Sequence, residues 1–209
     1  ETVTKEGETE KHRKTAIKYL RLANSFALIQ YKLATNLGKD VKFELHDEIF
    51  DVRAPKTAPF TTVDYWYKDL SVALILRDEL TIKTLLQYGP NNAANEKGEV
   101  TPFDASLCLF IKGIFDSKSD IKKQFGTLMD NVANSPKIPT RQCHIDLCIT
   151  PIIMAWAALI ENNMEKFERN IELATEGIRS YYKDSQWKYD SYGWFPPFLI
   201  AACVFAHDQ

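Results

Sequence analysis

Cys143, His144 and Cys148 come closest to the pattern of a chemical site. They are residue types that bind zinc, but zinc needs four ligands in a tetrahedral array, and this spacing shows no fourth ligand. A Cys–His nucleophile pair needs two side chains that meet, whereas the side chains of consecutive helical residues diverge by about 100°. We therefore interpret Cys148 as a core residue and His144 as a surface or capping residue, with no metal site and no catalytic residue among them.

The pair His207-Asp208 is the other candidate for catalysis. Such a pair is catalytic only with a nucleophile nearby, and it is more typical of a helix end, where the dipole favours the histidine. The sequence also contains no GxGxxG, GxxxxGK[ST], HExxH, CxxC or GxSxG motif. These observations predict a protein that is not an enzyme and that needs no cofactor.

Two groups of acidic residues could contact a basic partner. Between residues 161 and 176, glutamates recur every three or four residues, and an apolar row lies roughly 140° away around the helix. A solvated face is the ordinary interpretation of such a row, and an acidic patch is the alternative. The second group falls in an expected β-hairpin, whose exposed edge can dock a partner. The candidate contact residues are Glu165, Glu168 and Glu172 in the first group and Glu44, Asp47 and Glu48 in the second.

The segment from residue 181 to 198 is rich in aromatic residues that alternate with polar ones. Tyr and Trp are enriched at the hot spots of protein interfaces. The aromatic side chains either fold back onto the helical core or stay exposed in the polar loop. The candidate contact residues here are Trp187, Tyr189, Tyr192 and Trp194, and we expect the first three to be the most exposed.

Helical periodicity dominates the elements that must position these residues. Apolar residues follow a helical spacing from residue 11 to 37, and alternation between residues 41 and 53 predicts a small β-hairpin. Further helices are predicted over residues 62–76, 79–88, 102–115, 119–133, 143–160, 164–183 and 196–206. Within residues 143–160, Thr150-Pro151 is either the start of a new helix, with proline at its first position, or a kink. Short polar turns between them require antiparallel neighbours. We predict a mostly α fold of stacked antiparallel helical hairpins, with residues 1–10 frayed and residues 11–209 as a single domain.

The 209 residues have the composition of a soluble globular protein, with 45% hydrophobic and 26% charged residues. A net charge of −2 and the lack of a basic block argue against a nucleic-acid partner. No transmembrane helix is predicted, so we expect no membrane contact, and no signal peptide is visible. Most of the four cysteines, Cys108 and Cys203 among them, lie in apolar runs. We interpret them as core thiols of a reducing compartment and expect a cytoplasmic protein.

Three stretches resemble one family. Residues 64–78 carry a Trp, then Ala-Leu, then Arg-Asp; residues 151–167 carry Ala-Ala-Leu-Ile-Glu-Asn-Asn before a Phe; and residues 197–208 read Pro-Phe-Leu-Ile-Ala-Ala-Cys-Val-Phe-Ala-His-Asp. In this order and spacing, the stretches resemble the immunity protein 49 family of bacterial polymorphic-toxin systems. The resemblance implies a mostly α-helical antidote, without catalysis, that binds a toxin made by the same strain in interbacterial competition. It does not name the toxin.

The resemblance also singles out individual residues. Trp66 matches the family tryptophan, and its place at the start of an apolar helix indicates a packing anchor. Arg77 and Asp78 match the Arg-Asp turn. For both we expect structural roles, since an arginine near a helix C-terminus suits the dipole and an aspartate caps the next helix.

Three functions are compatible with the sequence. The first is an immunity protein that binds a cognate toxin domain and covers its active site or substrate groove, using the aromatic and acidic candidates above. The second is a helical-hairpin adaptor of the tetratricopeptide type, although the turns have no fixed period. The third is an enzyme with an unrecognised site. The first is the prediction, and the oligomeric state stays open.

Overall fold

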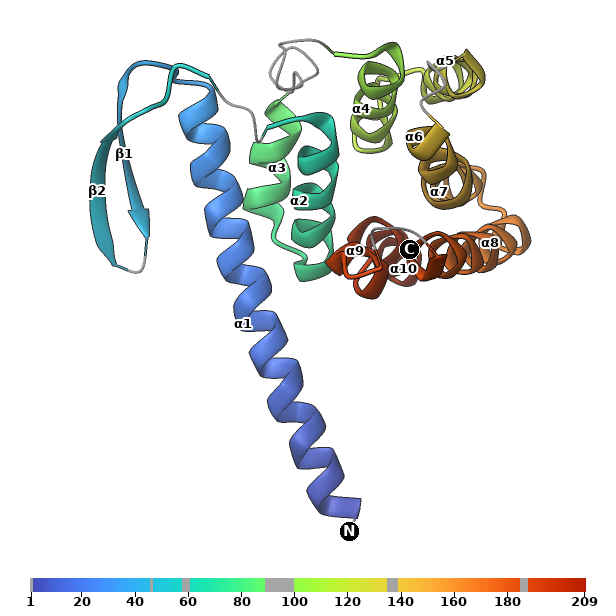
Figure 1. Ribbon diagram of the computed structural model, residues 1–209, viewed down its shortest axis with the longest axis horizontal. Helices are drawn as coiled ribbons and strands as arrows, with labels where there is room; N and C mark the ends of the chain where they lie inside the picture. Colours follow the sequence, from blue (N-terminus) through green and yellow to red (C-terminus); the bar gives the residue numbers. More distant parts are fainter. Residues whose placement is uncertain (1, 46, 58–60, 89–99, 135–138, 185–187) are drawn as a thin grey trace. The chain divides into compact units, whose positions relative to one another are not determined.

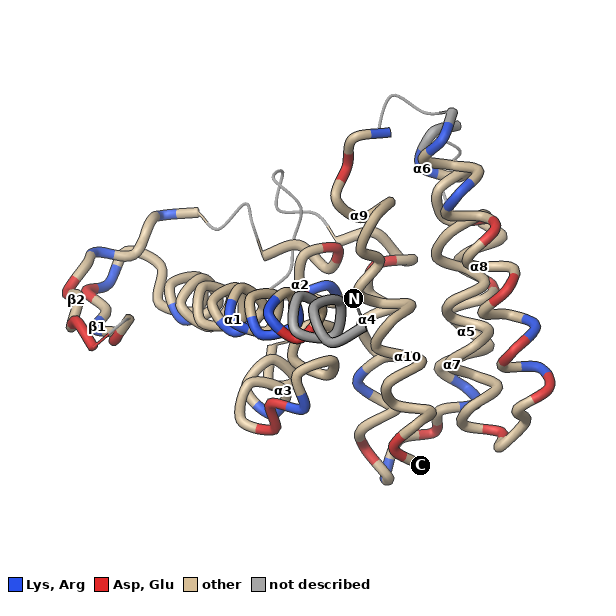
Figure 2. The backbone as a smooth tube through the Cα atoms, turned by 90° about the horizontal axis from the view of Figure 1, so that it is seen from below, with Lys and Arg blue, Asp and Glu red and all other residues tan. Residues whose placement is uncertain are grey.

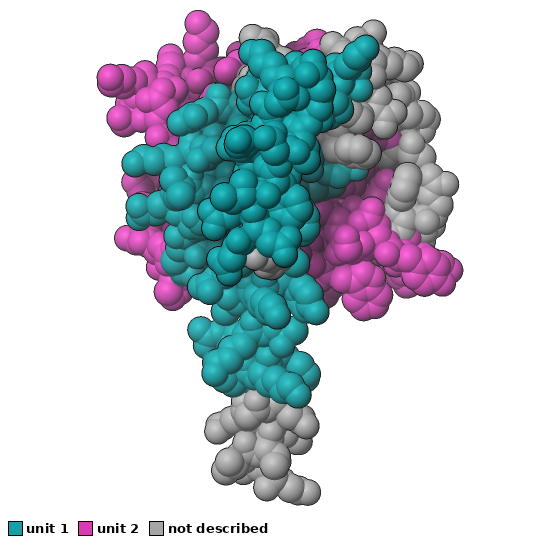
Figure 3. Space-filling view, turned by 90° about the vertical axis from the view of Figure 1, so that its left-hand side faces the viewer, with its two compact units in different colours: residues 1–98 teal, residues 99–209 magenta. Residues whose placement is uncertain are grey.

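The computed structural model describes residues 2–45, 47–57, 61–88, 100–134, 139–184 and 188–209. Helices make up most of these residues, and one two-stranded sheet accompanies them (Figure 1). The predicted mostly α fold with a small β-hairpin is confirmed. The chain divides into two compact units, Glu1–Gly98 and Glu99–Gln209 (Figure 3). The single domain expected over residues 11–209 stays a prediction.

The first unit consists of three helices and the hairpin. Its elements are α1 (Thr2–Ala34), β1 (Asp40–Leu45), β2 (Glu48–Arg53), α2 (Val63–Leu76) and α3 (Glu79–Gln87). The first of these begins at Thr2, so it includes most of the segment that was expected to fray. It ends at Ala34, before Gly38, which takes a φ of 70° in the following turn and donates its N–H to the Pro55 carbonyl at 3.2 Å.

The hairpin is antiparallel and has two different faces. Val41 pairs with Val52 and Phe43 with Phe50, and the two phenylalanine rings stack at 5.5 Å. The opposite face is charged, because period-2 alternation places the intervening residues there. On the α1 side, the Lys32 Nζ donates to the Lys42 carbonyl at 2.6 Å.

The core of the first unit forms around α2, with α1 and α3 packed against it. Its buried apolar side chains come from all three helices: Ala27, Tyr31, Val63, Trp66, Tyr67, Leu70, Ala73 and Leu85. The Trp66 indole Nε1 donates to the Leu85 carbonyl at 2.8 Å, which joins α2 to the end of α3. The prediction that Trp66 is a packing anchor is confirmed.

The second unit is a series of helical hairpins. Its elements are α4 (Pro102–Ile114), α5 (Ile121–Asn134), α6 (Pro139–His144), a π-helix (Ile145–Ile149), α7 (Thr150–Ile160), α8 (Met164–Asp184), α9 (Ser191–Trp194) and α10 (Pro197–Asp208). Its core is built from large apolar side chains: Phe103, Leu107, Phe110, Leu128, Ile152, Ile153, Trp156, Phe167 and Phe198. α4 with α5 and α7 with α8 form the predicted hairpins.

α8 packs closely against the π-helix that precedes α7. Pro151 has no N–H to donate to the Leu147 carbonyl four residues earlier, and the chain widens there, with the Thr150 N–H bonding to the Ile145 carbonyl. A Cβ added to Gly177 of α8 would lie 1.9 Å from that Leu147 oxygen. The helix therefore continues through Pro151 instead of starting again, and glycine is required opposite it.

Among the described residues, one helix, from Arg141 to Ile160, is long and apolar enough to cross a membrane by length and composition alone. In the structure its side chains Ile152, Ile153 and Trp156 are buried against neighbouring helices, as in the central helix of a packed core. The expectation of no membrane contact stays a prediction.

Candidate functional site

Exposed aromatic side chains follow α8 in the second unit. Tyr189 is 84% exposed and Trp194, the last residue of α9, is 81% exposed. α9 is a single helical turn held by Asp190, whose carboxylate accepts the Tyr192 N–H at 2.8 Å. Large apolar surface that faces water is costly, so two such rings close together in the sequence indicate a contact surface.

Tyr192 does not belong to this surface. It is only 4% exposed, whereas the sequence placed it among the residues expected to be most exposed. Its ring lies 6.0 Å from Tyr182 and 6.0 Å from His144. The physical reason is the capped turn, which directs Tyr192 inward while Trp194, two residues later, points outward. Trp187 lies outside the described residues.

The inward side of this turn is an aromatic cluster around His144. The Tyr181 ring centroid is 5.1 Å from the His144 ring, and the Tyr182 hydroxyl lies 3.5 Å from His144 Nε2. Burial raises the pKa of Tyr181, with smaller contributions from nearby thiols. The interpretation of His144 as a surface or capping residue is therefore wrong, because its ring is half-buried among tyrosines. Only the helical spacing of Tyr181 on the apolar row of α8 could have signalled this cluster.

Gly193 allows α9 to pack directly against the aromatic cluster around His144. A Cβ added to Gly193 would lie 2.7 Å from the Tyr182 side chain. α9 therefore approaches α8 at the one residue of the turn that has no side chain. This contact determines where the exposed side chain of Trp194 projects from the surface.

The four cysteines divide into two buried and two exposed thiols. Burial raises the pKa of the Cys148 thiol to about 12, and the same cause raises that of Cys108 to about 12. Cys143 and Cys203 are exposed, so the expectation of a core thiol is wrong for Cys203, which lies on the outer side of α10. Within the part of the chain that the structure describes, no group of His, Cys, Asp or Glu is arranged to hold a metal ion.

The glutamate row lies on the outer side of α8. Glu165, Glu168 and Glu172 are exposed, and the buried side of the same helix carries Phe167, Ala174 and Ile178. Basic residues share the outer side (Figure 2), and Lys166 pairs with Glu161 at 3.3 Å. The row therefore faces water, in a surface of mixed charge.

The second acidic group lies at the tip of the hairpin, in the first unit. Two other aspartates of the hairpin form ion pairs across the strands: Asp40 pairs with Arg53 at 3.2 Å, and Asp51 pairs with Lys42 at 3.5 Å. The three candidates of this group, Glu44, Asp47 and Glu48, are exposed, and their carboxylates form no ion pair with a described residue. Ile49, which lies opposite Glu44 in the register, is 79% exposed and adds apolar surface beside this acidic group, which the sequence did not single out.

The sequence of the whole chain decides the family. The model of the family described as immunity protein 49 matches residues 7–209. The chain belongs to the immunity protein 49 family. No curated protein and no solved structure shows a significant match to it. Nearly the whole chain, from α1 to α10, is thus covered by the family model.

The residues that suggested this family serve the fold. Arg77 ends α2 in a left-handed conformation with φ of 55°. Asp78 caps α3, accepting the Thr81 N–H at 3.1 Å and the Thr81 hydroxyl at 2.6 Å, and it also accepts from the Asn24 amide of α1 at 3.5 Å. The structural role predicted for Asp78 as a cap is confirmed. Asp78 thus joins α3 to α1 and serves the fold, while the Arg77 side chain is exposed at the end of α2.

Proposed function

We propose that this protein neutralises a cognate bacterial toxin by binding it and covering its active site or substrate groove. The family match supports the role of an immunity protein. The exposed rings of Tyr189 and Trp194 are the observation on which we base the location of the toxin-binding surface. Aromatic side chains that become buried when the partner binds, surrounded by a polar rim, usually contribute most of the binding energy of such interfaces. The protein acts without catalysis and in the cytoplasm.

The acidic residues assist encounter with the toxin. Glu165, Glu168 and Glu172 lie on the outer side of α8, the helix that leads to the aromatic turn. The hairpin tip offers a further acidic surface in the first unit. Exposed charges at an interface mainly change the association rate, and they would speed the approach of a basic toxin such as a nuclease.

Co-expression tests the proposal. The toxin domain encoded beside the gene is expressed in a sensitive host with and without this protein, and survivors are counted. We expect survival together with a stable complex that co-purifies. Survival without a complex would indicate an enzyme that reverses the damage. Failure to rescue, or binding of several unrelated extended peptides, would instead favour the adaptor.

A further inference from the structure

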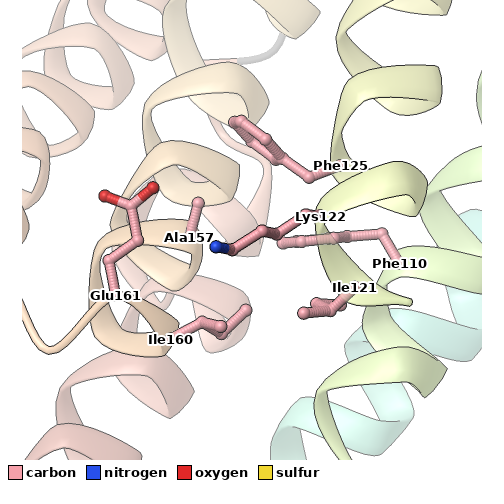
Figure 4. Close-up of a pocket in the computed structure, with 7 residues that line it drawn as sticks. All are labelled: Phe110, Ile121, Lys122, Phe125, Ala157, Ile160 and Glu161. Carbon is pink, nitrogen blue, oxygen red and sulfur yellow. The ribbon is translucent and has the colours of Figure 1, made fainter. Parts of the chain in front are cut away.

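A pocket of about 330 Å³ opens inside the second unit, between α4, α5 and α7 (Figure 4). The residues that line it are mainly apolar, with one charged residue of each sign: Phe110, Ile121, Lys122, Phe125, Ala157, Ile160 and Glu161. Its volume lies at the lower end of the roughly 300–1,000 Å³ of typical ligand pockets. None of the functions discussed above uses it.

The pocket exists because a small residue faces two large rings. Phe110 of α4 and Phe125 of α5 pack against each other at 5.7 Å, and α7 contributes the small Ala157 to the opposite wall, together with Ile160 (Figure 4). The α4–α5 turn is held in place by Asp116, which accepts the Lys118 N–H and the Ser119 hydroxyl, each at 3.0 Å. The walls are therefore fixed before any partner arrives.

The two charged residues at the rim of the pocket differ in their ion pairing. Glu161 is already paired with Lys166 at 3.3 Å. Lys122 is exposed and forms no ion pair with any described residue, and its side chain reaches across the pocket from α5 toward Ala157 (Figure 4). An anionic group near the opening would therefore find a free cation, while the apolar floor accepts a group without charge.

We infer that this pocket receives a large apolar side chain of the toxin, next to an acidic toxin residue that pairs with Lys122. The inference rests on the proposed function and adds a second anchor point to it. Hot-spot side chains fill desolvated pockets of this kind, and a preformed pocket avoids the entropy of ordering it.

A toxin side chain fits the lining better than a free small molecule does. The only lining residues with polar side chains are Lys122 and Glu161, so no polar side chain lines the floor to orient a separate ligand. A side chain delivered by a docked protein is already oriented by the rest of the interface. Glu161 also begins the glutamate row, so the pocket rim and that row share a residue.

Two substitutions test the pocket by different means. Ala157→Phe fills it, and Lys122→Glu reverses the charge at its opening. Binding to a catalytically inactivated form of the toxin domain encoded beside the gene is measured by calorimetry. We expect each variant to bind at least ten-fold more weakly than the unmodified protein. The matched controls are Ala133→Phe, at an exposed alanine of α5, and Lys123→Glu, at the exposed neighbour of Lys122; both should bind as the unmodified protein does.

The outcomes separate this inference from the proposed function. If the toxin binds and Trp194→Ala weakens binding while both pocket variants bind normally, the inference is overturned and the proposed function stands. If the unmodified protein does not bind the toxin, the proposed function falls. Lys122→Glu alters a surface residue, so its binding result stands even where thermal unfolding shows that Ala157→Phe fails to fold.

Discussion

Asp69 carries a carboxyl group whose charged form the fold disfavours. It lies on α2, where burial raises the pKa of its carboxyl from 3.8 to about 7, although a hydrogen bond from Tyr31 and the charge of Lys68 act in the opposite direction. Between these two pKa values the folded protein holds a proton that the unfolded chain has released. The stability of the fold therefore falls as pH rises through this range.

The first prediction concerns this carboxyl. From pH 5 to pH 8 the free energy of unfolding should fall by about 2–3 kcal/mol through Asp69, since one pKa unit corresponds to about 1.4 kcal/mol. Asp69→Asn should remove this part of the pH dependence and stabilise the protein at pH 8. Urea unfolding at four pH values measures it, with Asp130→Asn at an exposed position of α5 as the control. Equal pH slopes for Asp69→Asn and the unmodified protein would contradict the assignment.

The limits of the sequence are also visible at single residues. Trp66 and Asp78 were correctly assigned structural roles because the start of an apolar helix and the first residue after a turn have local signatures. Tyr192, His144 and Cys203 were misplaced, because their burial depends on which neighbouring helix covers them. A stretch of alternating polar and aromatic residues does not indicate which aromatic ring packs into the core.

Among the elements, helices and hairpin were predictable, whereas their irregularities were not. Helical spacing and β alternation extend over many residues, so the hairpin near residues 41–53 and the helix at residues 164–183 were found almost to the residue. The π-helix and the single turn α9 each span about one helical turn, too short for periodicity to detect. The pocket between three helices likewise depends on how they pack.

Two glycines give a second prediction, at the scale of helix packing. Gly177→Ala should destabilise the protein by more than about 2 kcal/mol, because the new Cβ would meet the Leu147 carbonyl at 1.9 Å and backbone cannot yield easily. Gly126→Ala on α5 is the matched control: its Cβ meets nothing within 4 Å, so the change should stabilise the helix by about 0.5–1 kcal/mol. Chemical denaturation measures both. A neutral Gly177→Ala would mean that α8 and the π-helix lie further apart.

For the whole molecule, the third prediction separates binding from folding. The double substitution of Tyr189 and Trp194 by alanine should weaken toxin binding by more than about 2 kcal/mol, roughly 30-fold, because both rings are exposed and available as anchors. The thermal unfolding temperature should change little, since neither ring is part of the core. Tyr19→Ala, at an exposed tyrosine of α1, is the control and should leave affinity unchanged. Unaltered binding by the double variant would remove the aromatic turn from the contact surface.

A fourth prediction uses the acidic residues. Replacing Glu165, Glu168 and Glu172 together by glutamine should slow association with a basic toxin by about ten-fold at low salt and leave the dissociation rate nearly unchanged. The difference should shrink in 0.5 M salt. Rates measured by surface plasmon resonance would decide this, and an unchanged association rate would identify the row as an ordinary solvated face.

The four thiols of the second unit differ in exposure, and this difference makes local opening of its helices measurable. Cys143 and Cys203 face solvent, whereas Cys108 and Cys148 are buried and held protonated. An alkylating reagent will therefore modify the first two directly and reach the others only when the helices around them separate. The rate at which the buried pair is labelled then gives the free energy of that separation in a cell lysate, without any introduced probe. A toxin that binds this unit should slow the labelling of the two buried cysteines.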